Sequence, residues 1–128
     1  MAGRDVAGFV DAGRTLYSLG LVKGSEGNLS TYDGVRLRIT RTGCRLASLE
    51  PADVLEGTLD DPPPGGSSDA ALHVGAYGSR GPGALAHAHP PGSVSEGWVE
   101  GEPHGVYGFG ATLGEAVAEI VRAARGDS

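Results

Sequence analysis

A chain of 128 residues, of which 39% are hydrophobic and 20% charged, can build one hydrophobic core but not two, so we expect a single domain over residues 1–128. A net charge of −6 without any basic run excludes extended contact with nucleic acid, which requires a basic face. No apolar run reaches the length of a membrane span and the single Cys44 cannot form an internal disulfide, which together favour a cytoplasmic protein.

The first predicted element is a helix. Apolar residues fall near helical spacing between Val6 and Tyr17. Gly20 stands where a helix would end in the left-handed conformation, which glycine adopts without strain. We therefore expect the helix to end just before Gly20.

A β-hairpin is predicted next. Runs at 28–31 and 35–40 flank the turn residues Tyr32-Asp33-Gly34. The second run alternates apolar Val35, Leu37 and Ile39 with polar residues, so one face of the hairpin is expected to be buried.

Residues 42–66 contain mainly turn residues, with a short helical segment expected after Pro51 and a stiff surface loop at 62–66. Ser67-Ser68-Asp69 then supplies a helix start, and the helix is expected to continue to Arg80. One face of this helix is expected to carry Leu72, His73, Ala76 and Tyr77. For His73 we favour packing against the core over metal binding.

Two strands and a helix are predicted in the last third of the chain. Residues 84–89 have the pattern of a short inner strand stopped by Pro90-Pro91, and 106–109 that of another. Thr112 and Glu115 form a capping box before the most regular helix of the chain. Its apolar stripe comprises Leu113, Ala116, Val117, Ile120, Val121 and Ala124.

His87 and His89 stand two residues apart on a predicted strand, so their side chains share one face. Two imidazoles at that spacing can reach one zinc ion, and His104, just before another strand, could complete a three-histidine site with an open position. The alternative is a pair of partly buried histidines beside a sheet edge.

Three small polar turns have the composition of phosphate-binding loops: one at 24–28, one at 41–43 and one at 66–68, which opens a helix. Each could equally be a plain turn or a cap. The glycines at 105–110 follow the order Gly-x-x-Gly-x-Gly, which is not the dinucleotide-binding fingerprint, so NAD binding is excluded.

Five motifs taken in order resemble the class II aldolase and adducin family, whose model member is fuculose-phosphate aldolase. The motifs are Gly27-Asn28-Leu29-Ser30, Ile39-Thr40-Arg41-Thr42-Gly43, Ser67-Ser68-Asp69 with His73, His87-Ala88-His89-Pro90-Pro91 and His104-Gly105. The resemblance covers most of the chain. It implies a three-layer α/β/α fold, in truncated form, with a mostly antiparallel central sheet flanked by helices.

The resemblance also implies roles for individual residues. His87, His89 and His104 match the family's zinc ligands, and Asp69 stands where the family has a glutamate that acts as acid and base. The phosphate-binding turns are matched by Gly27, Asn28, Thr42, Gly43, Ser67 and Ser68. A small phosphorylated substrate and assembly as a homo-oligomer, usually a tetramer, follow from the same resemblance.

The chain departs from the family pattern at two points. Asp69 is one methylene shorter than the family's glutamate, and only residues 92–103 separate Pro91 from His104, where the family has a much longer segment. No counterpart of the family's C-terminal extension is found after the last helix.

Three functions are therefore considered. The first is a zinc-dependent lyase that cleaves a carbon–carbon bond in a small sugar phosphate or hydroxy-carbonyl compound. The second is a sugar-phosphate dehydratase or epimerase, which would use the same metal and a differently placed base. The third is a catalytically silent metal-binding module. We favour the lyase.

Overall fold

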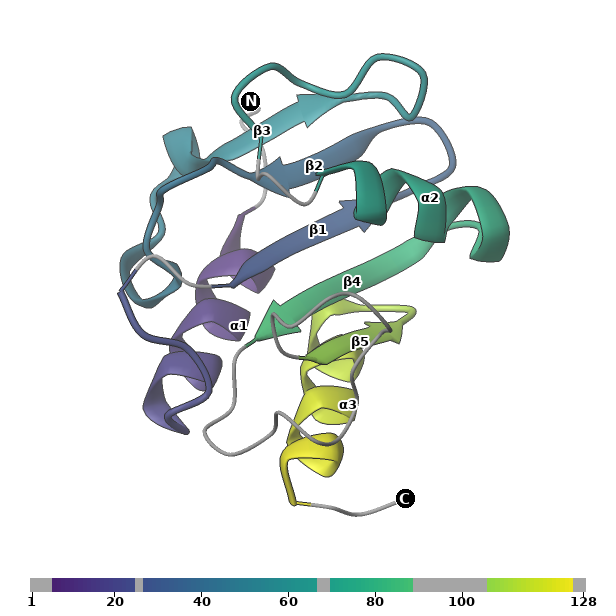
Figure 1. The fold of residues 1–128 in the computed structure, drawn as a ribbon. Helices are drawn as coiled ribbons and strands as arrows, with labels where there is room; N and C mark the ends of the chain where they lie inside the picture. Colours follow the sequence, from purple (N-terminus) through teal and green to yellow (C-terminus); the bar gives the residue numbers. More distant parts are fainter. Residues whose placement is uncertain (1–5, 25–26, 67–69, 89–105, 126–128) are drawn as a thin grey trace.

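The computed structural model of the chain describes residues 6–24, 27–66, 70–88 and 106–125. Within these ranges, one antiparallel sheet of five strands is accompanied by three α-helices and two short 3-10 helices (Figure 1). The elements are α1 (Ala7–Ser18), β1 (Asn28–Tyr32), β2 (Leu37–Thr40), η1 (Leu46–Ser48), η2 (Pro51–Asp53), β3 (Val54–Gly57), α2 (Ala70–Arg80), β4 (Gly83–Ala88), β5 (Val106–Gly110) and α3 (Leu113–Arg125).

The strand order in the sheet is β3-β2-β1-β4-β5, and each neighbouring pair is antiparallel. Helices α1 and α3 cover one face of the sheet, and α2 covers the other (Figure 1). The predicted three-layer α/β/α fold with a mostly antiparallel central sheet is confirmed. No helix in the described ranges is long and apolar enough to cross a membrane.

The two faces of the sheet bury different sets of side chains, because successive residues of a strand point to opposite faces. In β4, Ala84, Ala86 and Ala88 belong to the larger apolar cluster beneath α1 and α3. Leu85 belongs to the smaller cluster, together with Leu37 of β2 and Tyr77 of α2. The small alanines allow α3 to pack closely on β4.

Helix α1 ends as the sequence predicts. Gly20 has a φ of 75°, its N–H donates to the carbonyl of Tyr17 at 3.0 Å, and the N–H of Leu21 donates to the carbonyl of Leu16 at 2.9 Å. This pair of hydrogen bonds is the Schellman motif, and it satisfies two carbonyls that the helix itself leaves without a partner.

The hairpin differs from the prediction at its turn. Val35 is 70% exposed, because β2 begins only at Leu37 and the turn extends over 33–36. The carboxylate of Asp33 accepts the N–H groups of Arg36 and Val35, which lower its pKa, and so it holds the wider turn together. The prediction of a single buried face is also wrong at the end of β2, where Thr40 is buried and its hydroxyl accepts the N–H of Leu29 at 3.2 Å.

Strand β3 was not expected from the sequence. It follows η2, the short helical segment predicted after Pro51, and pairs with β2. The proline loop beyond it packs closely on the strand, since a Cβ added to Gly57 would lie 2.7 Å from Pro63. The loop is therefore part of the packed sheet edge as well as a surface feature.

Helices α2 and α3 agree with the sequence over their described residues, with two differences. His73 and Tyr77 are buried on α2, whereas Leu72 is 41% exposed and does not contribute to the core. The hydroxyl of Thr112 accepts the N–H of Glu115, as in a capping box, but the carboxylate of Glu115 accepts the N–H of Ala111, one residue before the cap.

Candidate active site

The predicted site residues that the structure describes lie at one end of the sheet. β1 begins at Asn28, whose register partner on β4 is His87. β4 ends at Ala88, opposite Val106 at the start of β5, and β2 ends at Thr40, which contacts Leu29. Antiparallel pairing therefore places the start of β1 and the ends of β2 and β4 at the same end (Figure 1).

His87 is held on two sides at this end. Its side chain is on the α2 face of β4 and is 2% exposed. The ring of Tyr107 stacks on it, with the two centroids 4.2 Å apart and the planes within 5° of each other. Its Nδ1 lies 3.3 Å from the carboxamide nitrogen of Asn28. These two contacts fix the plane and the rotation of the imidazole.

Asn28 connects His87 to a buried histidine on α2. The carboxamide oxygen of Asn28 is hydrogen-bonded to Nε2 of His73, whose Nδ1 lies 2.5 Å from the hydroxyl of Ser30. The same hydroxyl is 2.7 Å from the phenol oxygen of Tyr77. His73 is thus a core histidine, as the sequence analysis favoured, and both of its ring nitrogens have polar partners.

Tyr77 ends this series of contacts in an apolar setting. It is 1% exposed and packs against the rings of Tyr32 and Phe109, at centroid distances of 5.4 and 6.0 Å. Burial raises the pKa of Tyr77 to about 12, against the opposing effect of its hydrogen bond with Ser30. The phenol is therefore neutral throughout the physiological range.

Gly27 precedes Asn28 at the closest approach of two backbones. It has a φ of 82°, and a Cβ at this position would lie 2.7 Å from the carbonyl oxygen of His87. A side chain would be strained by the backbone conformation and blocked by β4. The glycine is needed to bring the first predicted phosphate turn against the strand of the predicted metal ligand.

The second predicted phosphate turn lies beside the segment that leads to the third. Thr42 and Gly43 are exposed, and Gly43 has a φ of 79°. The N–H of Thr42 donates to the carbonyl of Gly65 at 3.0 Å, and Arg41 forms a bridge with Gly66. The turn at 42–43 is therefore anchored next to the chain entering Ser67.

Arg41 supplies a positive charge next to this turn. Its guanidinium lies 2.5 Å from the carboxylate of Asp53, which also accepts the N–H of Glu50 at 3.0 Å. Burial opposes ionisation of Asp53, but the N–H of Glu50 and the Arg41 guanidinium outweigh it and lower the pKa of the carboxyl group. Part of the charge of Arg41 is thus balanced by Asp53, and the ion pair holds the turn on η2.

The remaining predicted site residues, Ser67, Ser68, Asp69, His89 and His104, lie outside the described residues. Of the three predicted zinc ligands only His87 is described, and the described ranges contain no group of three or more His, Cys, Asp or Glu side chains that could hold a metal. Cys44 is buried, and burial followed by the charge of Asp53 raises its thiol pKa, which agrees with a structural role.

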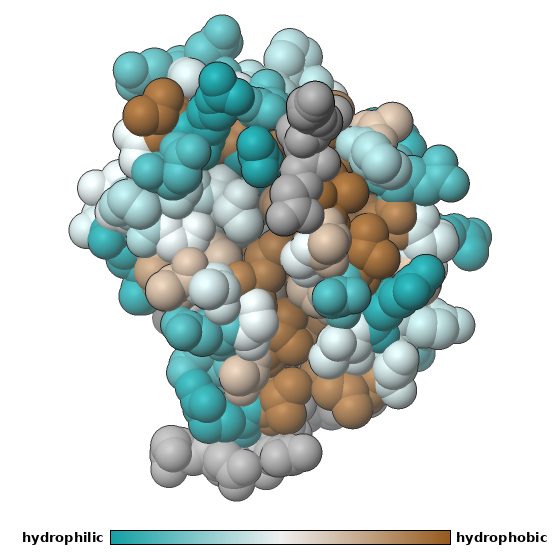
Figure 2. Space-filling view, turned by 180° about the vertical axis from the view of Figure 1, so that it is seen from behind, coloured by the Kyte–Doolittle hydropathy of each residue, from teal (hydrophilic) through white to brown (hydrophobic). Residues whose placement is uncertain are grey.

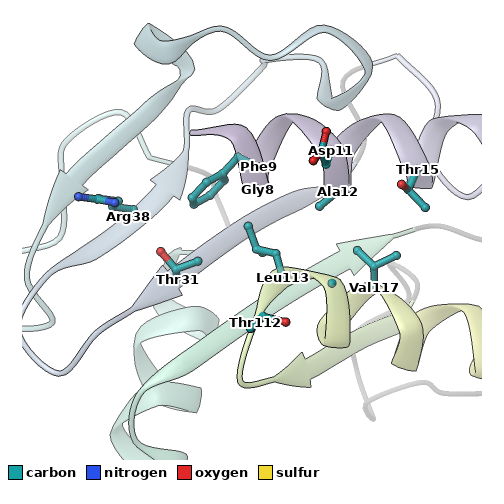
Figure 3. Close-up of a pocket in the computed structure, with 11 residues that line it drawn as sticks. Gly8, Phe9, Asp11, Ala12, Thr15, Thr31, Arg38, Thr112, Leu113 and Val117 are labelled. Carbon is teal, nitrogen blue, oxygen red and sulfur yellow. The ribbon is translucent and has the colours of Figure 1, made fainter. Parts of the chain in front are cut away.

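A separate groove of about 550 Å³ lies on the opposite face of the sheet, between α1 and α3. Figure 2 shows this face, where apolar side chains line a furrow. Phe9 of α1 and Leu113 of α3 point into it, with Thr31 and Arg38 on the sheet beneath (Figure 3). The groove is separated from His87 by the sheet, so it is not part of the candidate active site.

Four residues of the site region were given no site role from the sequence: Ser30, Tyr77, Tyr107 and the supporting Asp53. The family motif includes Ser30 and the helix face includes Tyr77, but only the packing of α2 on β1 shows that they meet. Tyr107 could have been found from the strand pairing, since it is the register partner of His87.

Comparison with known proteins agrees with this arrangement. Residues 7–97 match the model of the class II aldolase and adducin N-terminal domain. The 5-methylthioribulose-1-phosphate/5-deoxyribulose-1-phosphate aldolase of Rhodospirillum rubrum is 38% identical over 92 residues, which are 68% of this chain and 41% of that protein. A probable bifunctional methylthioribose-1-phosphate isomerase/methylthioribulose-1-phosphate dehydratase of Nocardia farcinica is 31% identical over 84 residues, 61% of this chain and 15% of that protein.

Solved structures share the fold. The L-fuculose-1-phosphate aldolase of Thermus thermophilus superposes with a TM-score of 0.80 at 24% identity, covering 93% of this chain and 90% of that chain. The chain has a class II aldolase fold and belongs to the class II aldolase and adducin family. It spans about two fifths of the length of its Rhodospirillum relative.

Proposed function

We propose that the protein is a metal-dependent, aldolase-type lyase that cleaves a carbon–carbon bond in a small sugar phosphate. The observation that carries this proposal is the setting of His87, a buried imidazole held by Asn28 and Tyr107 at the end of the sheet where the predicted phosphate turns at 27–28 and 42–43 lie. Membership in a family that includes sugar-phosphate aldolases supports it.

The metal site proposed here comprises His87, His89 and His104. His89 follows Ala88 at the end of β4, and His104 is two residues before Val106 at the start of β5. Ala88 and Val106 are register partners, so the end of β4 and the start of β5 lie side by side. Nitrogen donors of this kind suit zinc, and a ligand whose ring is held by neighbours suits a metal centre.

The proposed substrate is a ketose 1-phosphate, the class named for both curated relatives. Gly27 and Asn28, Thr42 and Gly43, and Ser67 and Ser68 would hold its phosphate, with the charge of Arg41 nearby. A phosphate handle fixes the orientation of the reacting carbons, which is a large part of catalysis in such sites.

Cleavage of the bond between C3 and C4 of a ketose 1-phosphate requires loss of the C4 hydroxyl proton and later protonation of C3. The products are an aldehyde and dihydroxyacetone phosphate. Asp69 is the residue proposed to move these protons. A bound divalent metal would supply Lewis acidity at the carbonyl oxygen, which is one way to stabilise the electrons released by bond cleavage.

Metal content and product analysis test this function. Purified protein is expected to hold about one zinc per chain, to lose it in His87→Ala, and to keep it in Tyr17→Ala, a control on an exposed position of α1. Incubation of the zinc protein with ketose 1-phosphates should release dihydroxyacetone phosphate. Bound zinc without release of an aldehyde from any of them would rule out the lyase.

The Nocardia relative favours one second candidate, a dehydratase acting on the same class of substrate. Loss of water leaves the carbon chain intact, whereas aldol cleavage divides it. Mass analysis of the product therefore separates the two reactions, because a dehydratase would yield one phosphorylated product of unchanged carbon number.

A further inference from the structure

Tyr107 of β5 lies against both of the histidines that the described ranges contain. It is the register partner of His87 on β4, and the two rings are stacked, with centroids 4.2 Å apart and planes within 5° of each other. The rings of Tyr107 and His73 are closer to perpendicular, at 70°, with centroids 6.4 Å apart. One phenol ring thus borders the predicted metal ligand and the core histidine of α2.

The sheet and α3 together fix the position of this stack. β5 pairs with β4 over all five of its residues, so Tyr107 cannot slide along β4 without breaking the ladder. α3 holds β5 from the opposite face, because a Cβ added to Gly108 would lie 2.1 Å from the carbonyl oxygen of Ala116. Tyr107 is therefore presented to His87 by a tightly packed part of the fold.

The stacked arrangement has an electrostatic consequence. The face of a phenol ring carries a negative potential, which attracts a cation placed over it within about 6 Å of the centroid. The imidazole of His87 lies inside that range, at 4.2 Å. An imidazole that donates electrons to a divalent metal acquires positive character, so Tyr107 attracts it more strongly than it attracts the neutral ring. A contact that is stronger in the metal-bound form raises the affinity for the metal.

The surroundings of Tyr107 favour this attraction. Its ring lines a cavity of about 310 Å³ between α2 and β5. The other apolar walls are Leu72, Ala76, Leu85 and Phe109. Electrostatic interactions are stronger beside apolar walls than in bulk water, because less solvent screens them. The cavity already contains one contact of this kind, since the guanidinium of Arg80 lies 4.8 Å from the centroid of the Phe109 ring.

We propose that Tyr107 is a positioning residue for the metal site: its ring holds the imidazole of His87 in place and raises the metal affinity by stacking on it. This inference rests on the proposed metal site. It gives a functional role to a residue outside the five sequence motifs, on a strand that contributes no predicted ligand of its own.

Zinc affinity, measured by competition with a chromogenic chelator, tests the stack through two variants. Tyr107→Phe keeps an aromatic face and should bind zinc within about threefold of the unchanged protein. Tyr107→Leu keeps an apolar side chain without an aromatic face and should bind about tenfold more weakly, as expected for an outer partner of a metal ligand. If Tyr107→Phe bound as weakly as Tyr107→Leu, the effect would belong to the hydroxyl and the inference would be overturned.

The matched control is Phe109→Leu, which removes an aromatic ring from the same strand and the same face of the sheet. Phe109 is the register partner of Leu85 rather than of His87, and its ring packs against Tyr77 at a centroid distance of 6.0 Å. This variant should leave zinc affinity unchanged. Equal losses in Phe109→Leu and Tyr107→Leu would show a general effect of destabilisation and would contradict the positioning role.

A spectroscopic measurement keeps the proposal testable if Tyr107→Leu does not fold. Zinc added to the unchanged protein should alter the tyrosine absorption in the near ultraviolet, and this change should be absent from Tyr107→Phe. Zinc that binds without this change, or that binds Tyr107→Leu as tightly as the unchanged protein, would overturn the role of Tyr107 and leave the metal site intact. Zinc that does not bind the unchanged protein would overturn the metal site and the inference together.

Discussion

The carboxamide nitrogen of Asn28 lies 3.3 Å from Nδ1 of His87, its register partner across the β1–β4 pair. One asparagine thus joins two predicted functions: it follows Gly27 in the first phosphate turn, and its side chain holds the predicted metal ligand. Changes at position 28 are expected to affect both.

Replacing a helical glycine by alanine should change stability in opposite directions at Gly13 and at Gly75. At Gly13 of α1 a Cβ would lie 2.1 Å from the carbonyl oxygen of Leu46, so Gly13→Ala should lower the free energy of unfolding by about 2 kcal/mol. At Gly75 of α2 no atom lies within 4 Å, so Gly75→Ala should raise it by about 0.5–1 kcal/mol. Urea unfolding of both variants measures the difference; equal effects would contradict the packing of α1 on η1.

Acid should weaken the Arg41–Asp53 ion pair that holds the turn at 42–43. The pKa of Asp53 is lowered in the folded protein, so its contribution to stability is present above the ordinary carboxyl pKa of 3.8 and is lost as the pH falls below it. Asp53→Asn should cost about 1 kcal/mol at pH 7 and much less at pH 3. The comparison is made on urea midpoints at the two pH values, and a constant difference would argue against an ionised Asp53.

High pH should destabilise the folded protein through ionisation of Tyr77. Its pKa is about 12 in the folded protein and near 10 when exposed, so its contribution to stability is complete below pH 10 and is lost as the pH rises toward 12. At pH 11 the stability advantage of the protein over its Tyr77→Phe variant should be smaller than at pH 8 by roughly 1 kcal/mol. An unchanged advantage would mean that the phenol ionises equally in both states.

Cys44 should be unreactive while the protein is folded. Burial and the nearby Asp53 raise its thiol pKa, so little thiolate is present at neutral pH. Alkylation by iodoacetamide should be slow in buffer and fast in urea, as followed by mass spectrometry. Rapid modification of the folded protein would point to a more open environment around η1.

The sequence predicts those helices and strands that are long enough to show a clear apolar periodicity. Helices α1 and α3 show apolar residues at helical spacing, and the inner strand β4 ends at Ala88, shortly before the proline pair in the sequence. β3 has only four residues after a helical turn, which is too short to show alternation. At Val35 the alternation is present but misleading, because the carboxylate of Asp33 extends the turn over that position.

The sequence identified individual residues of the site but not the contacts between them. The motif at 27–30 and the histidine at 87 could be identified along the chain, and the structure brings them together. The links through His73 depend on contacts between residues 43 and 45 positions apart, made by the packing of α2 on the sheet. Neither composition nor residue spacing predicts how a helix packs on a strand.

Because successive side chains of β4 point to opposite faces of the sheet, the site should be sensitive to a change in the length of this strand. Alanines at 84, 86 and 88 face α1 and α3, while Leu85 and His87 face α2. Inserting or deleting one residue within this strand would exchange its two faces, placing a methyl group where the imidazole belongs and the imidazole within the aliphatic layer. Length variation should therefore not be tolerated inside β4.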